Sequence, residues 1–178
     1  MSESRAYDPL RIIGVLWQCE VQYVLIGATA ARLQGFPRLT ADADITPATD
    51  YPNIERLATA LRQLNARIFV DGIPEGLPFE VDVRTLVRAD IWNLITDAGR
   101  LNVIFRPLGT DGYADLKRDA VQFQVEDARI SAASIADIIR CKRASDRPQD
   151  RADIPVLEAL VRQGGRRTGG IGPKRHAG

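Results

Sequence analysis

Residues 24–45, VLIGATAARLQGFPRLTADADI, decide the fold. An apolar run, Val24–Ile26, reads as a buried strand and stops at Gly27. A short alanine-rich segment follows, suited to a helix packed closely against its neighbours, before glycine and proline break the chain again. The chain then restarts as a second strand over residues 42–46. A strand, a tight glycine turn, a short helix and a second strand therefore stand in close succession.

Two carboxylates lie in this second strand. Because successive side chains of a strand alternate between its faces, Asp42 and Asp44 share one face, roughly 7 Å apart along the chain. Like charges on a half-buried surface repel, so a positive group is expected between them. A divalent cation with oxygen ligands meets this need. A simpler interpretation, two solvated acids at the end of a strand, remains open.

The composition excludes several other classes of function. The 178 residues are 45% hydrophobic and 26% charged, which is typical of one globular domain. No apolar run approaches the roughly 20 residues of a membrane span, and the acidic N-terminus does not resemble a secretory signal. Cys19 and Cys141 follow no metal-ligand spacing, and the single histidine, His176, argues against a histidine-based triad. A cytoplasmic protein with reduced thiols and no membrane partner is expected.

Charge is distributed unevenly along the chain. Residues 162–178 carry five basic side chains and no acidic one, leaving 19 basic and 23 acidic side chains in the rest. We therefore predict a domain over residues 1–163 and a basic, glycine-rich disordered tail over 164–178. Such a tail suits contact with nucleic acid, or it merely aids solubility.

The remaining elements follow from periodicity. Helices are predicted over residues 8–20, from about 50 to 65, over 113–119, from Ser134 to 143, and over 149–161 with an irregularity near Pro155. Residues 67–70 read as a short strand, and residues 91–106 and 121–131 as two hairpins. Residues 71–78 hold two glycines and two prolines and are predicted to be a loop, while 79–89 suit either a strand or a helix. The total is an α+β domain with a mixed β-sheet and flanking helices.

Three segments together resemble a known family. They are Gly27-Ala28 with Arg38-Leu39-Thr40-Ala41-Asp42-Ala43-Asp44, the stretch 92–103, and the stretch 139–153 with its Lys142 and Asp150-x-x-Asp153. Their pattern resembles nucleotidyltransferases of the DNA polymerase β-like fold, most closely the toxin-type branch of AbiEii/MenT-like proteins. The resemblance spans roughly residues 10–161 and rests on the combination of motifs, since Asp-x-Asp alone is weak.

The resemblance implies a role for each matching residue. Asp42 and Asp44 would hold Mg²⁺ or Mn²⁺ and, with Lys142 and Asp150, form the catalytic set. Phosphoryl and nucleotidyl transfer depend mainly on charge stabilisation, so cations and backbone amides are also needed. The residues expected to bind the NTP are Gly27, Ala28, Thr29, Arg38, Thr40 and Arg147.

Simpler roles stay open for several of these residues. Arg38 and Thr40 also suit an ordinary salt bridge and turn, and Lys142 also suits a solvent-facing helix position. Asp150 and Asp153 also suit the cap of the last helix, where acids favour the helix dipole.

Two positions depart from the family pattern. Ala28 stands where a small polar residue is common, which removes a side-chain phosphate contact and leaves the backbone amide. Asn102 stands at the position of the third acid, and an amide can ligate a metal but cannot supply charge. Glu80 and Asp82 are rival third acids, so the third metal ligand is expected to be Asn102 or Asp82.

The implied activity is metal-dependent transfer of a nucleoside monophosphate from an NTP to an acceptor hydroxyl. The family further implies a toxin of a toxin–antitoxin pair that modifies RNA, such as the 3′ end of tRNA, with an antitoxin protein as partner. The alternative is a weak or inactive nucleotidyltransferase-fold module that binds a nucleotide or a partner. Transfer to a small molecule such as an antibiotic, or to a protein side chain, is a third possibility.

Overall fold

The computed structural model describes residues 6–168, with side chains described as far as residue 164. In chain order its elements are α1 (Pro9–Gln18), β1 (Tyr23–Ile26), α2 (Gly27–Leu33), β2 (Asp42–Pro47), α3 (Tyr51–Gln63), β3 (Arg67–Val70), β4 (Ile73–Leu77), α4 (Val83–Leu86), β5 (Ile91–Thr96), β6 (Gly99–Ile104), α5 (Tyr113–Arg118), β7 (Val121–Val125), β8 (Ala128–Ala132), α6 (Ile135–Ser145) and α7 (Pro148–Thr168).

One eight-stranded mixed sheet runs through the molecule in the order β4-β3-β5-β6-β2-β1-β8-β7. The central strand β2 pairs antiparallel with β1 and parallel with β6, while β1 pairs parallel with β8. The predicted hairpins form as β5–β6 and β7–β8, both antiparallel. This arrangement confirms the predicted α+β class with a mixed sheet.

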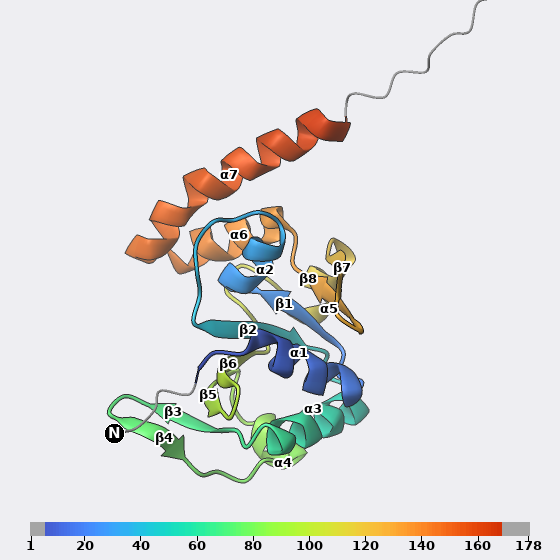
Figure 1. The fold of residues 1–178 in the computed structure, drawn as a ribbon, viewed down its shortest axis with the longest axis vertical. Coiled ribbons are helices and arrows are strands. Elements are labelled where there is room, and N and C mark those ends of the chain that lie inside the picture. Colours follow the sequence, from blue (N-terminus) through green and yellow to red (C-terminus); the bar gives the residue numbers. More distant parts are fainter. Residues whose placement is uncertain (1–5, 169–178) are drawn as a thin grey trace, which may run out of the picture.

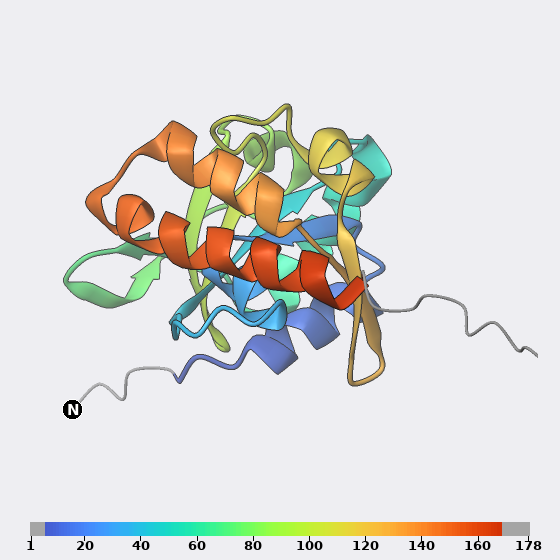
Figure 2. The same ribbon diagram turned by 90° about the horizontal axis from the view of Figure 1, so that it is seen from above.

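The helices gather in two groups (Figure 1). α1 and α3 pack against each other on one side of the sheet, and α6 and α7 pack against each other at the opposite end of the molecule. Seen from above, α7 crosses the sheet alongside α6 (Figure 2). Within residues 6–168, no helix combines the length and the apolar character needed to cross a bilayer.

Side chains at the helix starts explain why three helices begin where the sequence predicts. Asp8 accepts a hydrogen bond from the Arg11 amide at 3.0 Å at the start of α1, and Asp50 accepts one from the Asn53 amide at 3.0 Å at the start of α3. Ser134 caps α6 by accepting from the Asp137 amide at 3.1 Å. Each cap satisfies an amide that would otherwise lack a partner within the helix.

One prediction from the sequence needs correction, and one open alternative is resolved as a helix. Residues 71–78, predicted as a loop, contain strand β4, and the ambiguous segment 79–89 contains the short helix α4. Proline and glycine are tolerated in β4 because it is an edge strand with a register shift opposite β3. Gly76 has φ +69°, and a Cβ atom there would lie 2.6 Å from the Ile68 carbonyl oxygen.

The last helix continues past the predicted domain boundary. α7 runs from Pro148 to Thr168 and includes Pro155, whereas the boundary was predicted at residue 163. Residues 169–178 of the predicted tail, with His176, lie outside the described residues.

Candidate active site

The two carboxylates of β2 lie next to Asn102 of β6. Strands β2 and β6 are parallel, and their register places Asp44 beside Asn102 and Asp42 beside Arg100. Neighbouring residues in register project from the same face of a sheet, so all four side chains share one face. The Asn102 amide nitrogen donates to Asp44 Oδ1 at 2.8 Å and to Asp42 Oδ2 at 3.2 Å. The sheet thus brings together the three positions at which the resemblance implies metal ligands.

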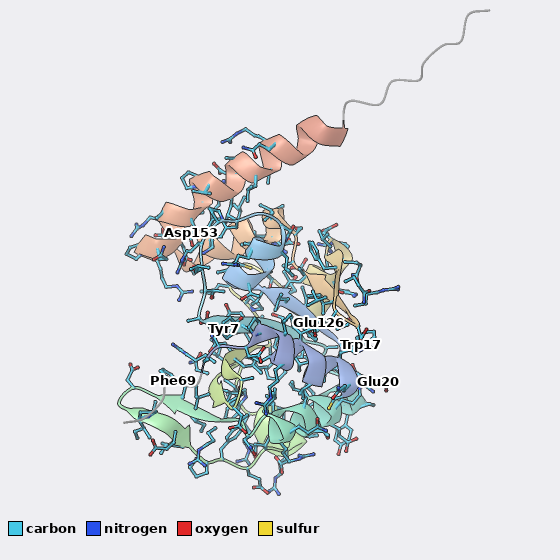
Figure 3. The ribbon with its side chains drawn as sticks, in the orientation of Figure 1. Tyr7, Trp17, Glu20, Phe69, Glu126 and Asp153 are labelled. Carbon is cyan, nitrogen blue, oxygen red and sulfur yellow. The ribbon has the colours of Figure 1, made fainter. Side chains whose placement is uncertain are left out.

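Hydroxyl groups hold Asp42 from both sides. Thr40 Oγ1 donates to Asp42 Oδ1 at 2.7 Å, and Thr29 Oγ1 donates to the Asp42 carbonyl oxygen at 2.9 Å. Tyr7, which precedes α1, lies with its hydroxyl 3.3 Å from Thr29 Oγ1 (Figure 3). Burial raises the pKa of Tyr7, the contact with Thr29 opposes this, and the charges of Asp42 and Asp44 raise it further. The Thr29 hydroxyl therefore binds the backbone of β2 and does not line the cavity.

Gly27 is required by the position of Asp44. Its φ of +66° is a left-handed conformation, and a Cβ atom at this position would overlap Asp44 Oδ2. A glycine at the end of β1 lets the backbone approach the carboxylate, which no other residue permits without displacing it. The glycine that the sequence singles out for phosphate approach is thus also packed against the carboxylate.

The carboxylate pair is electrostatically unfavourable as it stands. Burial raises the pKa of Asp44 to about 6, although the hydrogen bond from Asn102 lowers it; the charge of Asp42 raises it again. The charges of Arg147 and Arg100 lower it to a smaller extent. A buried carboxyl beside a like charge disfavours its ionised form, and a bound cation would reverse this effect.

The opposite wall is an ion-pair network on α6 and α7. Lys142 Nζ donates to Asp150 Oδ1 at 2.9 Å and to Asp153 Oδ2 at 2.8 Å, and Arg38 Nη1 reaches Asp153 Oδ2 at 2.8 Å. The side chains of Asp150 and Asp153 are 7% and 6% exposed, and that of Lys142 is 11% exposed. Figure 3 shows Asp153 near the start of α7, on the side that faces α6. The network fastens α7 to α6 and to the loop before β2.

Asp150 accepts several further donors. Ser145 Oγ donates to Asp150 Oδ2, and Arg147 Nε reaches the same oxygen at 3.1 Å. Burial would raise the pKa of Asp150, but the hydrogen bonds from Ser145 and Lys142 and the charges of Lys142 and Arg147 lower it to about 2. Asp150 therefore stays ionised and fixes Lys142 in place.

Both walls enclose one cavity of about 550 Å³, which lies within the usual range for small-molecule sites, roughly 300–1,000 Å³. Its lining includes these residues predicted from the sequence: Gly27, Ala28, Arg38, Thr40, Asp42, Asp44, Lys142, Arg147 and Asp150. Asn102 is 8% exposed and sits behind the carboxylates, and Thr29 points its hydroxyl at β2. The structure thus gathers most of the predicted set around one space.

Asp82 is placed elsewhere. Its carboxylate caps α4 by accepting from the Thr85 amide at 2.7 Å, and it lines a separate hollow formed mainly with α3. The backbone hydrogen bond from Thr85 is the main cause of the lowered pKa of Asp82. Glu80 is exposed in the segment before α4 and does not line the cavity. Of the candidate third ligands, only Asn102 lies beside the carboxylate pair.

Sequence reasoning missed several residues in and around the cavity. Asp90 and Arg106 line it from the segments flanking β5 and β6, and both are exposed. Arg100, in register with Asp42, stacks over the Phe69 ring at 3.9 Å. Only Arg100 carried a usable signal, because its spacing of two from Asn102 places both side chains on one strand face.

The donor set suits a hard divalent cation. Carboxylate and amide oxygens are the ligands that Mg²⁺ and Ca²⁺ prefer, and Asn102 Oδ1 is buried without a hydrogen-bond partner among the described residues. Two carboxylates and one amide would therefore hold the ion. The described residues contain no group of three or more His, Cys, Asp or Glu side chains placed to do so.

Comparison with known proteins identifies the fold. No family model matches the sequence, and no curated protein matches it. Among solved structures, the chain is similar to the lincosamide antibiotic adenylyltransferase LnuA bound to lincomycin, with 15% identity, a TM-score of 0.57 and coverage of 88% of this chain and 99% of that one. The chain has a nucleotidyltransferase fold. The comparison confirms the fold class predicted from the motifs.

A second solved structure, a protein from Thermotoga maritima described as a nucleotidyltransferase, has 13% identity and a TM-score of 0.47. The match covers 91% of this chain and 97% of the Thermotoga maritima chain.

Proposed function

We propose that the protein transfers a nucleoside monophosphate from an NTP to an acceptor hydroxyl and releases pyrophosphate, with Mg²⁺ or Mn²⁺ as cofactor. One observation carries the proposal: the Asp42–Asp44–Asn102 group and the Lys142 network face each other across a single cavity. The first wall offers oxygen ligands and the second offers cations, which are the two needs of a bound metal–triphosphate.

Each wall has a distinct task in this proposal. A bound divalent cation would neutralise developing charge on the phosphates and align them. Lys142, Arg147 and Arg38 would contact phosphate oxygens, and Asp150 would position Lys142, to which it is bonded at 2.9 Å. The backbone amides of Gly27 and Ala28, which line the cavity, would donate to the triphosphate.

The reaction is a displacement at the α-phosphorus. The acceptor oxygen forms a bond to this phosphorus while the bond to the pyrophosphate oxygen breaks, and the hydroxyl proton passes to solvent. Asp42 and Asp44, with their bound cation, would align the attacking and leaving oxygens. Lys142, Arg147 and Arg38 would stabilise the departing pyrophosphate.

For the acceptor we propose the 3′ end of an RNA such as tRNA, within a cytoplasmic toxin–antitoxin pair whose antitoxin binds this chain. The support for this finer proposal is the sequence pattern, which resembles the AbiEii/MenT branch in Arg38-x-Thr40-x-Asp42-x-Asp44 and in the Lys142 segment.

A small hydroxyl compound is the second candidate acceptor. Apolar side chains form part of the cavity wall, and two of them, Ile91 and Leu108, are 54% and 63% exposed. An apolar wall suits a small amphipathic molecule better than a polyanion. The solved structure with the higher TM-score is an enzyme named for a lincosamide antibiotic.

One labelling experiment separates the two acceptors. The purified chain is incubated with Mg²⁺ and each α-³²P-labelled NTP, with total tRNA in one arm and a panel of small hydroxyl compounds, lincomycin included, in the other. We expect label on RNA, lost by at least 100-fold in Asp42→Ala and kept in Arg143→Ala, whose pair with Glu158 is exposed. Label confined to the small-compound arm overturns the RNA proposal. No label in either arm, or equal labelling by Asp42→Ala, overturns the transfer proposal.

Asn102 motivates the remaining alternative, a module that binds NTP without transferring it. In that case NTP and Mg²⁺ would raise the melting temperature while no label is transferred, and Asn102→Asp would gain activity. Transfer by the unaltered chain contradicts this alternative.

A further inference from the structure

Within the described part of the chain, only the nitrogen of the Asn102 side-chain amide has hydrogen-bond partners. Its nitrogen bridges Asp44 Oδ1 and Asp42 Oδ2 at 2.8 and 3.2 Å, while its Oδ1 atom is buried and has no hydrogen-bond partner among the described residues. Buried acceptors are nearly always paired, so an unpaired one at the centre of a site requires an explanation.

In the present orientation the amide takes the place of a positive charge. Its nitrogen donates to both carboxylates and moderates their repulsion. Asp44 Oδ2 lies in the space that a Cβ atom at Gly27 would fill, so the missing side chain leaves room for this carboxylate. A cation between the carboxylates would instead oppose the N–H groups and attract the oxygen of the same amide.

A half-turn of the amide plane exchanges its nitrogen and oxygen with little change of shape. After this rotation Oδ1 faces the carboxylates, where an oxygen ligand is needed, and the nitrogen occupies the place of the unpartnered oxygen. The side chain therefore has two orientations, one for the free carboxylates and one for the metal-bound carboxylates.

The amide also limits how much positive charge the site can hold. Two carboxylates balance one divalent cation, whereas two such cations about 4 Å apart repel each other and need further negative ligands. Asp150 is committed to Lys142 and Arg147. Asp90 comes just before β5, and Asn93 of β5 is the residue in register with Asn102. Asp90 is therefore three residues along the strand from Asn93, a distance of roughly 10 Å.

We propose that Asp42, Asp44 and Oδ1 of Asn102, after a half-turn of its amide, hold a single divalent cation where other phosphoryl-transfer sites hold two. This inference rests on the proposed function, because it assigns the ligands and the metal count of the same site. Asn102 is thus a metal ligand, and its lack of charge sets the stoichiometry at one.

Mn²⁺ tests the inference without any measurement of activity. Bound Mn²⁺ is counted by equilibrium dialysis and electron paramagnetic resonance, first alone and then with a non-hydrolysable NTP analogue, on the full chain. We expect one Mn²⁺ per chain with the spectrum of an isolated ion. Asn102→Asp should take up a second ion and show a coupled two-ion spectrum. Asn102→Leu should raise the Kd for the single ion at least tenfold. Glu80→Gln, at an exposed position that does not line the cavity, should change neither count nor affinity.

Each contrary outcome has a separate meaning. Two coupled ions in the unaltered chain overturn the single-cation inference and leave nucleotidyl transfer standing. An unchanged Kd in a folded Asn102→Leu chain, checked by circular dichroism, overturns the ligand assignment; if that variant does not fold, the isosteric Asn102→Asp still decides the count. Absence of any Mn²⁺ binding that depends on Asp44 overturns this inference and the proposed function together.

Discussion

Two pairs of aspartates, one on the sheet and one on α7, behave in opposite ways. Asp42 and Asp44 lie on the sheet with only an amide between them, and the pKa of Asp44 is raised to about 6. Asp150 and Asp153 lie on α7 with Lys142 between them, and the pKa of Asp150 is lowered to about 2. The difference between the pairs is the group that separates them: a neutral amide in one case and an ammonium in the other.

This difference distinguishes a carboxylate pair that lacks a cation from one whose cation the protein supplies itself. The helix pair is neutralised by the protein's own cations, so it stabilises the packing of α7 whether or not a ligand is present. The sheet pair retains unfavourable charge in the folded chain, which is the condition in which an added cation contributes most. Four substitutions test the contrast, in order of the effect expected.

Lys142→Met should be the most destabilising change. It removes the cation between Asp150 and Asp153, and a buried ion pair that loses one partner costs about 3–5 kcal/mol. The free energy of unfolding from urea titration measures the loss. Arg143→Ala, which breaks an exposed pair with Glu158, is the control and should cost less than about 1 kcal/mol. Equal effects of the two substitutions would contradict the structural role given to the helix pair.

Asp44→Asn should stabilise the metal-free chain at pH 7 while abolishing metal binding. The native pKa of about 6 exceeds the ordinary value of 3.8, so the native state binds the proton more tightly and this group's contribution to stability falls as the pH rises from about 4 to 6. Removing the charge should recover about 2–3 kcal/mol above pH 6. Thermal unfolding at pH 4 and pH 7 in a chelator tests this, and a variant less stable than the parent at pH 7 would refute it.

Asp150→Asn should act with the opposite dependence on pH. The native pKa of about 2 lies below 3.8, so the stabilisation is fully present above pH 4 and is lost as the pH falls through 2. The variant should lose about 2 kcal/mol at pH 7 and approach the parent's stability near pH 2. Urea titrations across this range measure the difference, and a gap that does not shrink on acidification would rule out the ionised Asp150 as its source.

Gly27→Ala should have the smallest effect on stability of the four and a clear effect on the site. The added Cβ atom overlaps Asp44 Oδ2, and the alanine must adopt a φ of +66°. Together these two effects should lower the free energy of unfolding by about 1–2 kcal/mol. Gly72→Ala is the matched control, since it has φ +82° but nothing within 4 Å of its Cβ position. Calorimetric Mn²⁺ titration should show weaker binding only in Gly27→Ala; equal binding in both would remove the role given to the close approach.

The sequence predicts the sheet pair well because the information is local. Asp42 and Asp44 alternate within one strand, and the upstream glycine marks the end of the strand beside it, so strand periodicity places them without knowledge of the whole fold. The caps at Asp8, Asp50 and Ser134 are equally local, and each helix begins where its cap predicts.

The rest of the site depends on contacts that no local pattern encodes. Asn102 could be separated from Asp82 only once the parallel pairing of β2 with β6 was known, since the two strands lie far apart in sequence. The same holds for Arg38 with Asp153, and for Tyr7, whose hydroxyl reaches Thr29 from the segment before α1. Strand β4 was missed because its edge position tolerates the proline and glycine that normally indicate a loop.

The position of the transferred label tests the proposed chemistry itself, with NTP labelled at one of two phosphates. The chain is incubated with Mg²⁺, total tRNA or the small-compound panel, and NTP labelled with ³²P either at the α- or at the γ-phosphate. We expect the α-label on the acceptor and the γ-label in released pyrophosphate, with both lost in Asp42→Ala. The γ-label on the acceptor, or transfer that persists without Asp42, would contradict nucleotidyl transfer at this cavity.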